Sequence, residues 1–124
     1  MKSGFHRAAL ALLLGATAAN PAAAASTPAA RAEIEQLLAQ LADSGCEFQR
    51  NGEWHPGPEA RKHLERKYAY LLKKDLLHSS EDFIERAATR SSLSGQPYQV
   101  RCGAGVSASD DWLRTVLGRI RSGR

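Results

Sequence analysis

Residues 46–55, CEFQRNGEWH, contain the pattern that decides the fold, and residues 98–102, YQVRC, complete it. Asn51 and Gly52 separate two short segments of strand-like composition, and both residue types accept the positive φ angles of a two-residue type I′ turn. Residues 46–55 are therefore predicted to form a β-hairpin. Residues 98–102 alternate in the manner of a strand, which predicts a third strand in the same sheet.

The segments CEFQR and YQVRC mirror one another, since the first begins and the second ends with a cysteine. An antiparallel pairing that places Cys46 opposite Cys102 predicts a cross-strand disulfide. It would close a loop of more than fifty residues, for which chain-entropy models give about 4 kcal/mol of stabilisation. The same pairing sets further residues side by side, Phe48 with Val100 and Arg50 with Tyr98. The alternative, a two-thiol redox or metal site, has no C-x-x-C spacing to support it.

Four segments have the apolar spacing of amphipathic helices. They comprise residues 30–44, residues 59–77, a shorter helix that starts after Ser79 or Ser80, and a last helix capped by Ser109. Serine followed by acidic residues suits a helix start, because the hydroxyl accepts a backbone N–H group and the carboxylates face the positive end of the dipole.

The remaining stretches are predicted to be irregular. Residues 91–97 (SSLSGQP) and 103–108 have the composition of loops, and the terminal RSGR is expected to fray. The prediction is an α+β fold in which four helices pack around a small antiparallel sheet, made of the hairpin 46–55 and the strand 98–102, in a single domain.

Residues 1–25 have the three parts of a secretory signal peptide. Lys2 and Arg7 precede an uncharged, leucine-rich run, and the alanines at 22–25 offer a small-x-small cleavage site. The apolar run is too short to span a bilayer core, so no transmembrane segment is expected after processing. The sequence predicts a periplasmic or secreted protein whose mature domain is residues 26–124.

Composition narrows the class of the mature protein. Removal of residues 1–25 leaves 99 of the 124 residues, which suffices for one core and not for two. It also removes two basic residues, so that 15 basic residues face 13 acidic ones and the net charge falls from +4 to +2. Nucleic acid is not an expected partner of an exported domain this close to neutral.

The polar segment at residues 91–98, SSLSGQPY, is the strongest candidate for a binding site, because hydroxyl and backbone N–H groups suit an anion or a sugar. A well-packed turn explains this segment equally well. The candidate binding residues of the segment, the hairpin and the neighbouring helix are Arg50, Asn51, His63, Ser91, Ser92, Ser94, Gly95 and Tyr98.

A small periplasmic hydrolase is the alternative interpretation of the same loop. A serine among Ser91–Ser94 would act as the nucleophile and His63 as the base. The chain lacks the Gly-x-Ser-x-Gly elbow, and no acid has a spacing that would orient His63. No catalytic residue is therefore assigned from the sequence.

A basic face is predicted on the second helix, opposite its apolar stripe. Its members are Lys62, Arg66, Lys67, Lys73 and Lys74, and His63 and Tyr70 share the same arc. Such a face suits an anionic lipid or glycan, or an acidic envelope protein, whereas a solvated face that binds nothing is the simpler explanation. The histidines show no ligand spacing, so neither a metal nor a cofactor is predicted.

Several motifs of the chain resemble those of the YfeK-like family of small exported bacterial proteins. They are Phe48-x-Arg50-Asn51-Gly52, Glu59-Ala60-x-x-His63-Leu64-x-x-Lys67, Phe83-Ile84 and Ser91-Ser92-Leu93-Ser94-Gly95-x-Pro97-Tyr98. The resemblance covers roughly residues 34–102 and omits the last helix. That family is a domain of unknown function, so the resemblance implies a bacterial periplasmic location and no activity. The sequence thus predicts a non-catalytic binding module of the cell envelope.

Overall fold

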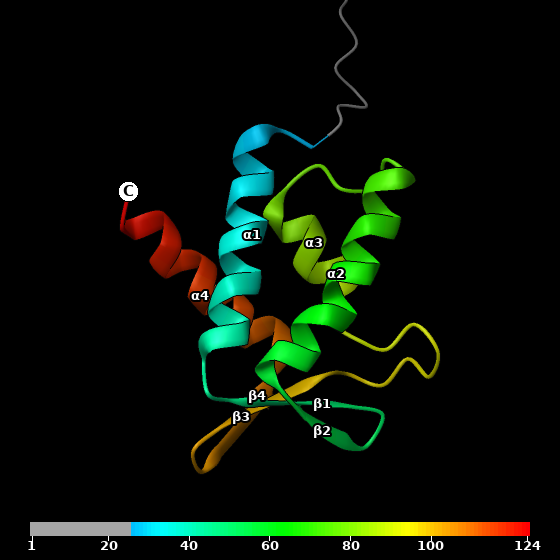
Figure 1. Cartoon of the computed structure of the whole chain (residues 1–124), viewed down its shortest axis with the longest axis vertical. Helices are drawn as coiled ribbons and strands as arrows, with labels where there is room; N and C mark the ends of the chain where they lie inside the picture. Colours follow the sequence, from blue (N-terminus) through cyan, green and yellow to red (C-terminus); the bar gives the residue numbers. More distant parts are fainter. Residues whose placement is uncertain (1–25) are drawn as a thin grey trace, which may run out of the picture.

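The structure, a computed structural model, describes residues 26–124, and the predicted signal peptide lies outside the described residues. Its elements are α1 (Pro28–Asp43), β1 (Glu47–Arg50), β2 (Glu53–Pro56), α2 (Gly57–Lys73), α3 (Ser80–Ala87), β3 (Gln99–Cys102), β4 (Gly105–Ala108) and α4 (Ser109–Ser122). All four helices lie on one side of a single antiparallel sheet (Figure 1). The predicted α+β class with one core is confirmed.

The sheet has the strand order β2-β1-β3-β4, and each neighbouring pair is antiparallel. The hairpin turn has the predicted chemistry, since φ is 51° at Asn51 and 86° at Gly52. Phe48 lies opposite Val100, as predicted, and both side chains are buried. Two residues beyond this pairing the predicted disulfide joins Cys46 to Cys102, whose Cα atoms are 4.4 Å apart.

A fourth strand corrects the prediction for residues 103–108. Residues 105–108 form β4 and pair with β3 along its whole length, and Gly103 with φ 71° makes the turn between them. The prediction of a loop was wrong because Gly105, Ser107 and Ala108 have small side chains without apolar alternation. Backbone hydrogen bonding to β3, rather than side-chain burial, holds this edge strand in place.

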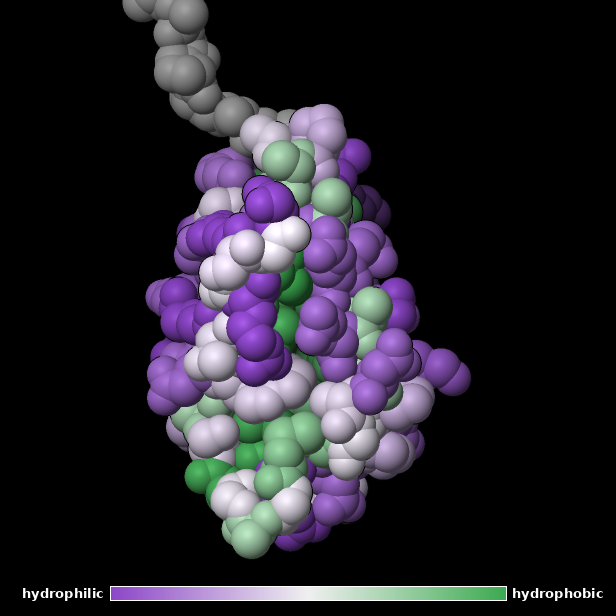
Figure 2. All heavy atoms as spheres, turned by 90° about the vertical axis from the view of Figure 1, so that its left-hand side faces the viewer, coloured by the Kyte–Doolittle hydropathy of each residue, from purple (hydrophilic) through white to green (hydrophobic). Residues whose placement is uncertain are grey.

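α1 packs against all three other helices, as α3 also does, and its contact with α2 is the most extensive between helices. Ile34, Leu37 and Leu38 are completely buried on its inner face. Hydrophilic side chains cover most of the molecular face seen in Figure 2, and apolar surface gathers at its lower end, where the sheet lies. No helix within residues 26–124 is long and apolar enough to cross a membrane.

The second predicted helix is shorter at its end than the apolar spacing indicated. α2 stops at Lys73, and Asp75 adopts a left-handed φ of 56°. Leu77 is nevertheless 1 % exposed, because the chain after the helix turns its side chain back into the core. Leu77 has helical spacing but belongs to the loop after α2, and its burial there explains why the predicted end of the helix was wrong.

The last helix differs from the prediction at both ends. Ser109 does not cap α4: Ala108 holds the cap position without a side-chain hydrogen bond, and the buried Ser109 donates its backbone N–H to the Tyr98 carbonyl at 2.9 Å. The predicted fraying of the terminus was also wrong, because α4 continues to Ser122 and Arg121 is held by two carboxylates.

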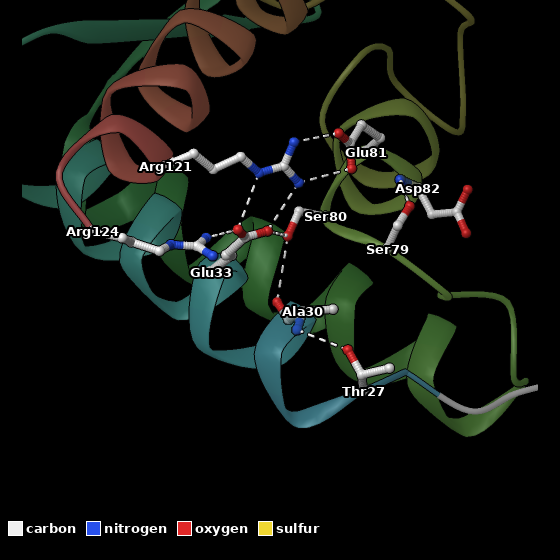
Figure 3. A network of polar contacts seen from close by, with 9 residues as sticks. All are labelled: Thr27, Ala30, Glu33, Ser79, Ser80, Glu81, Asp82, Arg121 and Arg124. Atoms are coloured by element: carbon white, nitrogen blue, oxygen red, sulfur yellow. Dashed lines mark hydrogen bonds and ion pairs between the residues drawn. The ribbon is translucent and has the colours of Figure 1, made fainter.

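Those carboxylates belong to a polar network that joins α1, α3 and α4 (Figure 3). Glu33 on α1 is buried, accepts the Ser80 hydroxyl at 2.6 Å and accepts two hydrogen bonds of 3.0 Å from Arg121. The same guanidinium reaches Glu81 at 2.7 Å, and Arg124 forms a further ion pair with Glu33. The network satisfies a buried charge, which would otherwise be costly.

Candidate functional site

The serine loop, residues 91–97, follows α3 and is held in one shape by Ser91. This side chain is 4 % exposed, and its hydroxyl accepts the backbone N–H groups of Leu93 at 3.1 Å and Ser94 at 3.2 Å. Gly95, with φ 77°, donates its N–H to the Ser91 carbonyl at 2.9 Å. Two of the candidate binding residues, Ser91 and Gly95, therefore shape the loop from within.

The serine loop contacts the hairpin, so the candidate residues of these two segments lie near each other. The hydroxyl of Ser94 donates to the side-chain oxygen of Asn51 at 2.6 Å across a sequence separation of 43 residues. This contact fixes the loop to the turn between β1 and β2. Ser92 has a different position, because its exposed side chain lines an open hollow on the α2 side of the loop.

Tyr98 contacts two other candidate residues, His63 and Lys67. Its hydroxyl lies 3.0 Å from Nε2 of His63 and accepts a 3.1 Å hydrogen bond from Nζ of Lys67. The same Nζ donates to the Arg90 carbonyl at 3.1 Å and lies 5.0 Å from the centre of the Tyr98 ring. Because an ammonium group has no acceptor, we assign the phenolic proton of Tyr98 to the bond with His63.

Burial and neighbouring positive charge set the protonation of this cluster. Desolvation, helped by the charge of Arg50, lowers the pKa of His63 to about 4. The same two causes lower the pKa of Lys67 to about 8. At neutral pH His63 is therefore uncharged and Lys67 still carries its proton. Burial is the larger cause of both shifts, and the neighbouring positive charges add to it.

An open hollow of about 320 Å³ adjoins this cluster, and we call it the basic hollow. It is lined by His63, Arg66, Lys67, Tyr70, Leu71, Arg86 and Ser92, with no carboxylate among them. Within the described part of the chain, none of its three cationic side chains, Arg66, Lys67 and Arg86, forms an ion pair with a carboxylate. Positive groups in a concave surface without a counter-charge are suited to an anion.

Other spaces near the basic hollow are less suited to a ligand. A wider hollow of about 810 Å³ shares Arg86 and Ser92 with it, and that hollow also contains the carboxylates of Glu81, Asp82 and Glu85. On the inner side of His63 a cavity of about 30 Å³ is on the scale of a water molecule. Of the two hollows, the one that combines cations with no carboxylate lies on the α2 side of the loop.

The residues of the basic face predicted on α2 do not all point to solvent. Lys62, Lys73 and Lys74 remain exposed, and Lys74 lies 5.8 Å from the centre of the Tyr70 ring. Lys67 instead turns inward to Tyr98. Arg86 of α3 was not among the candidate residues, because its place beside α2 depends on helix packing that periodicity does not reveal.

The hydrogen bonds offer no support for a nucleophilic serine. His63 is bonded to Tyr98, and no hydrogen bond joins it to Ser91, Ser92 or Ser94 in residues 26–124. Ser91 and Ser94 use their hydroxyl groups within the loop and the hairpin contact. Across the same residues no three histidine, cysteine or acidic side chains gather in a cluster able to hold a metal ion.

Comparison with known proteins identifies a family whose function is unknown. The model of a family described as "Family of unknown function (DUF5329)" matches residues 28–121. That match confirms the predicted membership of a family of unknown function and extends it over α4, whereas the YfeK-like name and the bacterial origin stay predictions. No curated protein and no solved structure matches the chain.

Proposed function

The chain belongs to the family of unknown function DUF5329, and on the geometry of its site we propose that it is a non-catalytic binding module for an anionic ligand. The ligand occupies the basic hollow and contacts Arg66, Lys67 and Arg86. A phosphate or carboxylate group is the expected chemistry, since guanidinium and ammonium groups bind both.

The observation that carries the proposal is that Arg66, Lys67 and Arg86 form no ion pair with a carboxylate within residues 26–124. Arg61, Arg101 and Arg121 all reach carboxylates, whereas Arg66 and Arg86 face the hollow without one. An anion in the hollow would supply the missing counter-charge. It would also favour protonation of His63, whose pKa is held down by burial and positive neighbours.

Titration with inorganic pyrophosphate, followed by two-dimensional NMR at low salt, tests the proposal. We expect shifts concentrated at His63, Tyr70 and Ser92 and a rise in the pKa of His63. Arg86→Gln should weaken binding about tenfold, as expected for the loss of one charge-assisted hydrogen bond. Arg119→Gln is the matched control, since this exposed arginine lies on α4 outside the basic hollow. Equal effects of the two variants, or no saturable shift, would refute the site.

The proposal includes a place of action in the cell envelope of a bacterium, in keeping with the YfeK-like resemblance. Two observations support export: the signal-peptide pattern of residues 1–25 and the Cys46–Cys102 disulfide, since such bonds persist in oxidising compartments. Fractionation of expressing cells, with N-terminal sequencing of the product, tests it. A mature chain that starts near Ser26 in the periplasmic fraction is expected, and an unprocessed cytosolic chain would contradict export.

A further inference from the structure

Leu93 is the most exposed large apolar side chain of the described residues, at 92 %. It lies at the tip of the serine loop, directly after Ser92, which lines the basic hollow. Figure 1 shows this loop standing out from the body of the molecule beside α2. Nothing in the core requires a leucine here. A single exposed apolar residue is common on protein surfaces, so the inference depends on the charged groups beside it.

The loop presents this leucine in a fixed shape. The Ser91 hydroxyl accepts two N–H groups of the loop, and Ser94 ties the loop to Asn51 of the hairpin. An apolar group held rigidly away from the core loses little conformational entropy when a partner covers it. Tyr70, 58 % exposed, lines the basic hollow next to the loop and adds an amphipathic ring to the same side.

We propose that the tip of the serine loop and the basic hollow together dock on an anionic lipid surface. Leu93 enters the boundary between headgroups and acyl chains, while Arg66 and Arg86 contact lipid phosphates. The inference rests on the proposed anion binding and names its source as the headgroups of a bilayer. Tyrosine is enriched at the headgroup level of membranes, which suits the position of Tyr70.

The arrangement favours a bilayer over an acidic protein. A protein partner is usually recognised by a contiguous apolar centre with a polar rim. Here one leucine projects beside the basic hollow, whereas the carboxylates of Glu81, Asp82 and Glu85 line the wider hollow on the α3 side of the loop. An exposed apolar group next to cations is the combination by which peripheral proteins add apolar insertion to attraction for anionic lipids. Lys73 and Lys74, exposed further along α2, extend the positive charge available to such a surface.

Vesicle sedimentation tests the docking surface with the whole mature chain at low salt. Vesicles of phosphatidylcholine with about one third phosphatidylglycerol are compared with phosphatidylcholine alone, because the charge of the first attracts basic groups. Wild-type protein should bind only the anionic vesicles. Leu93→Asp should weaken this binding about tenfold or more, and Arg86→Glu should do the same. Matched controls are Val106→Asp, an exposed apolar position on β4, and Arg119→Glu on α4.

The outcomes separate this inference from the proposed function. Saturable pyrophosphate binding without vesicle binding would overturn membrane docking and leave the anion site intact, whereas loss of both would overturn both. Leu93→Ser, which removes the apolar group without adding a charge, should still bind pyrophosphate like the wild type and should bind the anionic vesicles more weakly. If that variant also binds vesicles normally, or if soluble polyglutamate competes as well as the lipid, the surface recognises charge alone and the bilayer proposal fails.

Discussion

The phenolic hydroxyl of Tyr98 lies 3.0 Å from Nε2 of His63, which places the residue directly before β3 in contact with the middle of α2. The hydroxyl also accepts a hydrogen bond from Lys67. One oxygen thus accepts from a cation and donates to a neutral imidazole, and both of its partners border the basic hollow. Tyr98 therefore helps to position two of the side chains that line the basic hollow.

Replacement of Tyr98 by phenylalanine should lower the free energy of unfolding by about 1 kcal/mol, since it removes both hydrogen bonds and keeps the buried ring. Tyr70→Phe is the matched control, because the Tyr70 side chain is 58 % exposed, and it should change stability by no more than about 0.5 kcal/mol. Urea unfolding measures both. Equal losses in the two variants would show that the Tyr98 hydroxyl contributes no net stability.

The neutral state of His63 predicts a dependence of stability on pH. Its pKa is about 4 in the folded protein and about 6.5 in the unfolded chain, because burial and nearby cations disfavour the charged ring in the fold. Above pH 6.5 the ring is neutral in both states. As the pH falls from 6.5 towards 4 the unfolded chain binds a proton first, so the stability contributed by the neutral ring is lost in this window.

Unfolding of the wild type and His63→Gln, measured across this window, checks the prediction. The wild type should lose more stability between pH 6.5 and pH 4 than the variant, which has no imidazole to protonate. NMR titration of the His63 ring gives an independent reading of the pKa in the folded state. Parallel stability curves, together with a pKa near 6.5, would contradict the burial argument.

Features that depend on local interactions could be predicted from the sequence. The turn at Asn51 and Gly52 needs only two residue types with positive φ, and the mirrored cysteines then set the register of β1 and β3. Ser79 was predicted as a possible cap of α3, and its hydroxyl does accept the N–H of Asp82 at 3.0 Å. Each of these features depends on interactions between neighbours in the chain or between two matched strands.

Features that depend on how helices pack could not be predicted in this way. Glu33 occupies an apolar position of α1 and is buried only because Ser80 and Arg121 reach it from α3 and α4. Arg86 reaches the basic hollow for the same kind of reason, since α3 lies beside α2. Arg66 and Lys67 were predicted as part of the basic face on α2, whereas Arg86 and the hollow that it shares with them required the tertiary structure.

The network around Glu33 predicts that Arg121 stabilises the fold. Arg121→Met should cost about 2 kcal/mol, because the buried carboxylate loses two donors, while its remaining contacts with Ser80 and Arg124 limit the loss. Arg119→Met, on the same helix, should stay within about 0.5 kcal/mol. Thermal and urea unfolding measure both. Equal stability of these two variants would indicate that Arg121 does not stabilise the fold and that the C-terminal residues fray, as their sequence predicts.

Two helical glycines offer the sharpest test of packing. A Cβ atom at Gly57, in the first turn of α2, would lie 2.5 Å from the Leu41 carbonyl oxygen and 2.8 Å from that of Ala42. These are backbone atoms of the α1 terminus and cannot turn aside. Gly57→Ala should therefore force the two helices apart and cost about 1–3 kcal/mol.

Gly118 in α4 provides the opposite case, because a Cβ atom there would meet no atom within 4 Å. Gly118→Ala should raise the free energy of unfolding by about 0.5–1 kcal/mol, since alanine loses less backbone entropy than glycine when a helix forms. Urea unfolding of the two variants beside the wild type should thus give shifts of opposite sign. A stabilising Gly57→Ala would mean that α1 and α2 are not in close backbone contact, and a destabilising Gly118→Ala would mean that the outer face of α4 is covered.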